Sequence, residues 1–209
     1  MCTSLTFAPD VATEVAACYD PAAMDRAEKP FQYAHAPVTS AVVLRYHRLR
    51  RALAADSLRD LAVEEEALAL LHAVIGAGAA ERGERFTADR ACIGARAARR
   101  HRETAEAVRE RLAAAPGEAH TLDSLARAVE VSPFHLARVF HRETGMPIHQ
   151  YLLQLRLALA VERLGDGVAI GAVALDLGFS SHSHFTTLFR QRYGVSPRDV
   201  GRVLGAASA

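Results

Sequence analysis

The sequence predicts a mainly α-helical fold whose second half holds two helix-turn-helix units. Residues 132–145 return in altered form as residues 181–194, at a constant offset of 49 residues. Apolar side chains recur at helical spacing from Thr39 to the C-terminal region. Serine, threonine, proline and glycine stand where these helices would start and stop, so the helix-capping and helix-ending residues agree with the apolar spacing.

Residues 1–38 have no helical periodicity and contain four prolines. Short apolar runs between these prolines predict minor β-strands at Leu5–Ala8 and Phe31–Ala34.

Two amphipathic helices are expected next, over residues 39–53 and 58–75, separated by Asp56 and Ser57. They would pair as an antiparallel hairpin, with Glu64, Glu65 and Glu66 facing solvent. Four glycines among charged residues then predict a linker over residues 76–97, which divides an N-terminal region of residues 1–75 from the rest.

After residue 97 the chain is predicted to be one helix after another. The expected helices span residues 98–115, 122–130, 132–144, 147–164, 169–177, 181–193 and 197–204. The fourth of these is apolar around its whole girth, so it must be covered on two sides. Such a helix suits a strut between two small lobes.

Charge is divided unevenly along the chain. Residues 98–209 hold 14 arginines against 11 acidic residues, whereas residues 1–97 hold 11 basic against 13 acidic residues. The second half is therefore expected to be the half that meets phosphate. Lys29 is the only lysine, and either nucleic-acid binding or the base composition of the source genome explains the preference for arginine.

Other classes of protein fit less well. Cys2, Cys18 and Cys92 are too scattered for a disulfide framework or a zinc site. The apolar run Ala67–Ala80 is too short to span a bilayer, and no secretory signal is visible. We expect a cytoplasmic protein without membrane association, metal or cofactor, and not an enzyme, because no catalytic set stands out.

The two repeated helices have one apolar and one polar face. Helical geometry turns one set of side chains inward: Leu136, Val139, Phe140, Phe185, Leu188 and Phe189. It turns another set outward: Phe134, Arg138, His141, Ser183, Thr187 and Arg190. In a helix-turn-helix the outward face of the second helix lies against base edges in the major groove.

A family resemblance rests on ordered motifs. Residues 178–185, Phe189-Arg190 and residues 193–197 resemble the signature of bacterial AraC/XylS-type transcription regulators, and residues 125–145 are similar to the first helix-turn-helix of that family. The resemblance covers residues 98–204. It implies seven helices in two lobes joined by a long helix, with recognition helices at 132–144 and 181–193 entering successive major-groove segments.

The resemblance also implies roles for individual residues. It assigns base contacts to Phe134, Ala137, Arg138, His182, Ser183, Thr186 and Thr187. Contacts to phosphate fall to Ser132, His141, Arg142, Ser181, Arg190 and Arg192. Arg138 can donate two hydrogen bonds to guanine, although an outward arginine can also be merely solvated. Phe134 has a second interpretation, packing against a neighbouring lobe.

Members of this family commonly carry an N-terminal effector-binding β-barrel followed by dimerisation helices. The hairpin at residues 39–75 is similar to those helices, but the segment before it is too short for a barrel, which leaves effector binding open. A homodimer contact is predicted at Leu61, Leu68, Leu71 and Ile75. An intramolecular core explains the same stripe equally well.

The expected function is therefore sequence-specific regulation of transcription, with double-stranded promoter DNA and RNA polymerase as partners; activation is one of its two expected modes and repression is the other. The alternative is a ligand- or thiol-responsive sensor that uses Cys18 or Cys92 and the same DNA-binding domain. A DNA-repair alkyl transferase fused to such a domain is a third hypothesis, against which the scattered cysteines argue.

Overall fold

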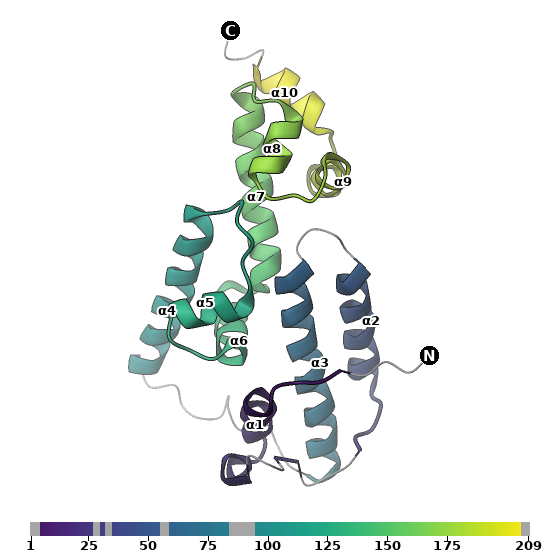
Figure 1. Ribbon diagram of the computed structural model, residues 1–209, viewed down its shortest axis with the longest axis vertical. Helices are drawn as coiled ribbons and strands as arrows, with labels where there is room; N and C mark the ends of the chain where they lie inside the picture. The colour runs from purple at the N-terminus through teal and green to yellow at the C-terminus, as the bar shows by residue number, and fades with distance from the viewer. Residues whose placement is uncertain (1–4, 27–29, 32–34, 55–58, 84–94, 206–209) are drawn as a thin grey trace.

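The computed structural model describes residues 5–26, 30–31, 35–54, 59–83 and 95–205, and every regular element within them is a helix (Figure 1). The N-terminal region contains α1 (Pro9–Ala17), the 3₁₀ helix η1 (Pro21–Arg26), α2 (Ser40–Ala54) and α3 (Arg59–Glu81). The remainder contains α4 (Ala95–Ala114), α5 (Leu122–Ala128), α6 (Pro133–Thr144), α7 (Ile148–Gly165), α8 (Ile170–Asp176), α9 (His182–Tyr193) and α10 (Pro197–Gly205). The prediction of seven C-terminal helices is confirmed for these residues. No helix among them is long and apolar enough to cross a bilayer.

The predicted strand at Leu5–Ala8 is wrong. These residues form no regular structure, and α1 begins directly after them with Pro9 in its first turn. The second predicted strand, Phe31–Ala34, falls mostly outside the described residues.

The antiparallel hairpin of α2 and α3 is confirmed, but α3 is longer than predicted (Figure 1). It runs through Gly76 to Glu81, so the predicted linker at 76–97 begins too early, and α4 already starts at Ala95. A Cβ atom on Gly76 would lie 2.5 Å from the Tyr19 hydroxyl oxygen. Gly76 therefore lets the chain that follows α1 pack closely against α3, and it does not break the helix.

Both repeated helices are capped as the sequence predicts. The hydroxyls of Ser132 and Ser181 each accept a hydrogen bond from the backbone N–H three residues later, at 3.1 Å. Gly145 and Gly194 end the helices with φ of 77° and 74°, a conformation that favours glycine. The two repeats thus share their local geometry as well as their sequence pattern.

Helix α7 joins two separate hydrophobic cores, as the strut prediction requires. Ile148 and Leu152, in its N-terminal half, belong to a core shared with α1, α3, α4, α5 and α6. Leu157 and Leu164, in its C-terminal half, belong to a core shared with α8 and α9. We call these the first lobe (α4–α6) and the second lobe (α8–α10), and Figure 1 shows α7 running between them.

A buried arginine fixes the junction of the two lobes. Arg156 is 3% exposed and donates from Nε to the carbonyl of Pro116 at 2.6 Å. Its Nη1 and Nη2 donate to the carbonyls of Gly178 and Glu118, both at 3.0 Å. Burial lowers the pKa of Arg156 to about 10, which leaves the guanidinium charged at neutral pH. One cation on α7 therefore ties the loop after α4 to the turn before α9.

Two glycines allow this close approach. A Cβ atom on Gly178, whose φ is +71°, would lie 2.4 Å from the carbonyl oxygen of Gly117. A Cβ atom on Gly117 would lie 2.1 Å from the carbonyl oxygen of Asp176. The turn of the second helix-turn-helix thus packs backbone against backbone on the loop that joins α4 to α5 in the first lobe.

Gly178→Ala should destabilise the chain more than Gly194→Ala. Both glycines have positive φ, which costs a residue with a Cβ about 1–2 kcal/mol. Only Gly178 also has a backbone atom in the way, since nothing lies within 4 Å of the Gly194 position; the overlap should add about 1–3 kcal/mol. Urea unfolding of both variants measures the difference, and equal losses would show that the Gly117 contact contributes nothing.

Candidate nucleic-acid interface

The inward faces of both recognition helices are placed as predicted. Leu136, Val139 and Phe140 of α6 are buried in the first lobe, and Phe185 and Phe189 of α9 are buried in the second. Leu188 packs against the second core and is partly buried. Each helix therefore presents its opposite face away from its own lobe.

The outward face of α9 is open. Five of its predicted DNA-contacting residues are exposed, as is the N-cap Ser181, and Thr186 is partly buried. The exposed five are His182, Ser183, Thr187, Arg190 and Arg192. The Thr187 hydroxyl donates to the Ser183 carbonyl at 3.0 Å, so this short side chain is turned back toward its own helix.

The outward face of α6, by contrast, is partly covered by the hairpin. Phe134 is only 7% exposed, and its ring stacks on that of His72 in α3 with centroids 5.9 Å apart. Its prediction as an open base-contacting residue is wrong for this arrangement, and the alternative of packing against a neighbouring element is what the structure has. The reason is that α3 supplies an apolar partner that local periodicity could not reveal.

A cavity of about 740 Å³ separates the rest of this face from the hairpin. Ala137, Arg138, His141 and Arg142 line one side of it. Helices α2 and α3 line the other with Ala41, Arg45, Glu65, Glu66, Leu68, Ala69, His72 and Ala73. Ala137 and Arg138 are partly buried, whereas His141 and Arg142 are exposed. The predicted contact residues of the first repeat are thus brought together on a surface that the hairpin covers in part.

Arg138 is partly buried, and one of its guanidinium nitrogens has no hydrogen-bond partner among the described residues. This nitrogen, Nη1, is itself buried. An unpaired guanidinium N–H costs free energy when it is removed from water. In this arrangement Arg138 lacks an acceptor of the kind that a guanine edge or a phosphate would supply.

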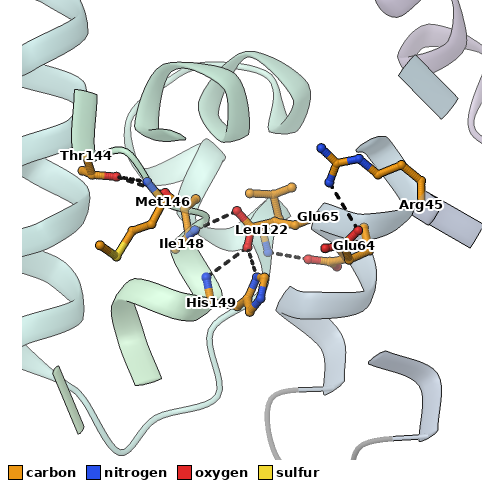
Figure 2. Close-up of polar contacts among 9 residues, drawn as sticks. Arg45, Glu64, Glu65, Leu122, Thr144, Met146, Ile148 and His149 are labelled. Atoms are coloured by element: carbon orange, nitrogen blue, oxygen red, sulfur yellow. Dashed lines mark hydrogen bonds and ion pairs between the residues drawn. The ribbon is translucent and has the colours of Figure 1, made fainter. Parts of the chain in front are cut away.

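Three glutamates attach the N-terminal region to the first lobe, and sequence analysis assigned none of them this role. Glu65, 8% exposed, accepts hydrogen bonds from the backbone N–H groups of Ile148 at 2.8 Å and His149 at 2.9 Å (Figure 2). Its carboxylate also lies 2.7 Å from His149 Nδ1. Glu65 was expected to face solvent; it is instead buried at the start of α7, whose N-cap residue Pro147 offers no side-chain acceptor.

The other two glutamates act on neighbouring helices of the same lobe. Glu64 accepts a hydrogen bond from the Leu122 N–H at the start of α5 (Figure 2). Glu14 of α1 accepts one from the Ser132 hydroxyl, at the start of α6. We call Glu14, Glu64 and Glu65 together the carboxylate contact. The run of three glutamates at 64–66 was the available signal, but periodicity alone could not show which of them was covered.

The apolar stripe predicted to form a dimer contact lies inside the chain. Leu61, Leu68 and Ile75 are buried in the core that α3 shares with the first lobe, and Leu71 packs against it. Their assignment to a homodimer interface is therefore wrong for this arrangement, and the intramolecular alternative is correct. The stripe covers the first lobe because α3 crosses it rather than standing apart.

The first lobe also contains a pair of histidines that favour the neutral state. His101 of α4 and His135 of α6 make an edge-to-face contact with centroids 5.6 Å apart. Burial, followed by the charges of Arg138 and His101, lowers the pKa of His135. Burial, followed by the charge of Arg142, lowers that of His101, although Glu143 opposes this. The positive charges of Arg138 and Arg142 on α6 thus disfavour protonation of the His135 and His101 rings.

His135→Gln should make the stability of the chain less sensitive to acid. Because the pKa of His135 is lower in the fold, the unfolded chain binds more protons as the pH falls below about 6.5, and stability is lost there. Without this histidine the free energy of unfolding should fall less steeply between about pH 6.5 and 5, by up to about 1.4 kcal/mol per pH unit. Urea titrations across this range measure the slope. His182→Gln, on the exposed face of α9, is the control, and equal slopes for all three proteins would contradict the expectation.

Comparison with known proteins matches the same part of the chain. A family model described as a helix-turn-helix domain matches residues 125–202. The transcriptional activator RhrA of Rhizobium meliloti is 34% identical over 90 residues, which are 42% of this chain and 28% of that protein. The bifunctional transcriptional activator and DNA repair enzyme AdaA of Bacillus subtilis is 35% identical over 78 residues, which are 37% of each.

Among solved structures, an AraC-type transcriptional regulator from Chromobacterium violaceum is 28% identical, with a TM-score of 0.47, and covers 49% of this chain and 93% of that one. This chain spans only about a third of the length of the curated relatives it matches, 28% and 37% for the two above. The matched segment holds α6, α7, α8 and α9 whole, so the likeness includes both recognition helices and the helix that joins them.

Proposed function

We propose that this chain, whose residues 125–202 form a helix-turn-helix domain of the AraC type, binds promoter DNA in a sequence-specific manner and regulates transcription. The observation that carries the proposal is the duplication of a capped recognition helix on both sides of one buried strut. A protein that holds two such helices rigidly can place them in successive major-groove segments, one helical turn of about 34 Å apart.

The residues on the outward faces suggest how the two helices divide the work. Arg138 is the side chain best suited to base recognition, because a guanidinium can donate two hydrogen bonds to O6 and N7 of guanine. Ala137 is small enough to contact a thymine methyl group. On α9, His182, Ser183, Thr186 and Thr187 are short or flexible polar groups, and we assign them weaker base contacts. The second helix would then contribute more to position than to sequence preference.

Phosphate contacts surround these base contacts in the proposal. Arg190 and Arg192 are exposed on the last turns of α9, and Ser181 caps its start. On the first lobe His141 and Arg142 stand beside Arg138, with Ser132 at the helix start. Such groups fix the register of a protein on the duplex without distinguishing one sequence from another.

Partners other than DNA extend this proposal. Relatives that are named transcriptional activators support a positive role in transcription, and contact with RNA polymerase is the most direct way to exert it. A regulator of this kind acts in the cytoplasm, where bacterial promoters are found. A homodimer or an effector complex would need a surface other than the buried stripe of α3.

A catalytic role has less support. AdaA is named both an activator and a DNA repair enzyme, but its match covers the helix-turn-helix part of this chain. The thiol-sensor alternative is not favoured either: Cys18 lies beside the Glu14 carbonyl, with 3.5 Å between Sγ and O, and Cys92 is outside the described residues. No group of three potential metal ligands occurs in the part of the chain that the structure describes.

Arg138→Ala should remove the preference for one base pair and weaken specific binding by about 1–3 kcal/mol, since a bidentate guanine contact is lost. Arg192→Ala should instead weaken binding to all sequences about equally. Selection of bound duplexes from a random library, repeated with each variant, measures both effects. An unchanged sequence preference for Arg138→Ala would remove this residue from the base-contacting set.

Binding should also weaken steeply as salt concentration rises, because each neutralised phosphate releases counterions. The logarithm of the binding constant should fall with the logarithm of salt concentration, with a slope near −0.9 for each phosphate contacted. Arg190→Gln and Arg192→Gln should each reduce that slope by about 1. Titration of a labelled duplex at four salt concentrations gives the slope, and a slope near zero would exclude a phosphate-contacting interface.

A further inference from the structure

The structure holds the two recognition helices in different states of access. The outward face of α9 is exposed. On α6, by contrast, Phe134 is buried against His72 of α3, and Ala137 and Arg138 are partly buried in a groove whose other wall is formed by α2 and α3, while His141 and Arg142 at the far end of the helix are exposed. A B-DNA major groove is about 12 Å wide and admits one helix, not a helix together with a neighbour that covers part of its outward face. While α3 lies against Phe134, α6 therefore cannot bring Phe134 and Arg138 to base edges until the hairpin moves away.

The hairpin is held in place partly by charge. Helix α3 presents Glu64 and Glu65 to the starts of α5 and α7, and α1 presents Glu14 to the Ser132 hydroxyl. Glu65 has the strongest set of contacts, with two backbone N–H groups and the His149 ring within 2.9 Å of its carboxylate oxygens. Hydrogen bonds to a buried carboxylate are stronger than those between neutral groups. The carboxylate contact thus fixes where α1 and α3 lie on the first lobe.

The outward surface of α6 and the hairpin surface that faces it carry opposite charges, as a DNA-binding protein and DNA do. The α6 wall of the groove carries Arg138 and the exposed Arg142, and the wall formed by α2 and α3 carries Glu65 and Glu66 beside Arg45. Negative groups of the N-terminal region thus face a surface whose proposed ligand is the negatively charged duplex.

Packing between the hairpin and α6 is incomplete. Leu61, Leu68 and Ile75 attach α3 firmly to the core of the lobe, but the cavity of about 740 Å³ separates the hairpin from Arg138 and its neighbours. This space is an open groove that water can enter, so the hairpin and the outward face of α6 are not close-packed there. The hairpin is therefore anchored beside the surface that would contact bases but does not fill it.

We propose that α1, α2 and α3 form an autoinhibitory element, which occupies the DNA-binding face of the first lobe and which the carboxylate contact keeps closed. This inference rests on the proposed function. The chain exists in a closed state, in which Phe134 and Arg138 of α6 are covered while α9 is accessible, and an open state, in which both recognition helices can engage DNA. The apparent affinity for a duplex then equals the affinity of the open state reduced by the fraction of chains that are open.

The test compares two glutamates of α3 in the full chain. Glu65→Gln keeps the size of the side chain and one acceptor but removes the charge that binds the start of α7. Glu81→Gln is the matched control, because Glu81 is exposed at the C-terminal end of α3 and does not line the groove beside Arg138. The probe is one labelled duplex, the sequence that the Glu65→Gln chain enriches most from a random library. We expect Glu65→Gln to bind it about tenfold more tightly than either the unmodified chain or Glu81→Gln.

The outcomes separate this inference from the proposed function. Equal affinities for all three proteins would overturn autoinhibition while leaving DNA binding intact. Failure of every protein to enrich any duplex would overturn the proposed function, and the inference with it. A tenfold gain confined to Glu65→Gln supports both.

Hydrogen exchange on the unmodified chain provides a second test that needs no substitution. Adding the same duplex should speed amide exchange in α1 and α3, which leave the lobe, and slow it in α6 and α9, which enter the grooves. Unchanged or slower exchange in α3 when DNA is bound would contradict an opening of the hairpin, whatever the stability of the variants.

Discussion

The buried guanidinium of Arg156 is the interaction on which the arrangement of the two lobes depends. It donates to three carbonyl oxygens, two from the loop between α4 and α5 of the first lobe and one from the turn that precedes α9. A cation buried to this extent is tolerated only because its donors are satisfied. Removing it would leave those carbonyls without their charged partner and free the second turn from the loop. The separation of the recognition helices thus depends on one side chain as well as on the stiffness of α7.

The first lobe must satisfy two partners with one surface. In the closed arrangement Glu65 supplies the acceptor that the start of α7 lacks, and His72 supplies a ring for Phe134. Arg138, however, keeps a buried N–H without a partner. The hairpin therefore provides partners for the start of α7 and for Phe134, but none for the buried N–H of Arg138, where a duplex would place base edges. This difference provides a physical basis for exchange between an internal partner and DNA.

Much of the fold followed from local sequence signals. Ser132, Ser181, Gly145 and Gly194 marked helix ends by capping chemistry that acts within a few residues, and all four were placed correctly. Apolar residues on all faces of α7 predicted two cores, because a helix without a polar face must be covered on more than one side. These features depend on neighbours along the chain, which a single sequence displays directly.

The errors arose where the partner lies far along the chain. Gly76 was assigned to a linker because the Tyr19 contact that requires it belongs to another element. Phe134 was assigned to DNA and Glu65 to solvent for the same reason. Periodicity showed which face each occupies but not that α3 lies against α6 and α7. Only the tertiary arrangement shows that one of two similar recognition helices is covered.

The most direct test of the account is a hydroxyl-radical footprint of the full chain on a selected duplex. Two recognition helices held apart by α7 and Arg156 should protect two backbone segments about one helical turn apart on one face of the DNA. A single protected segment at every protein concentration, or two whose spacing varies from site to site, would contradict a rigid pair of recognition helices.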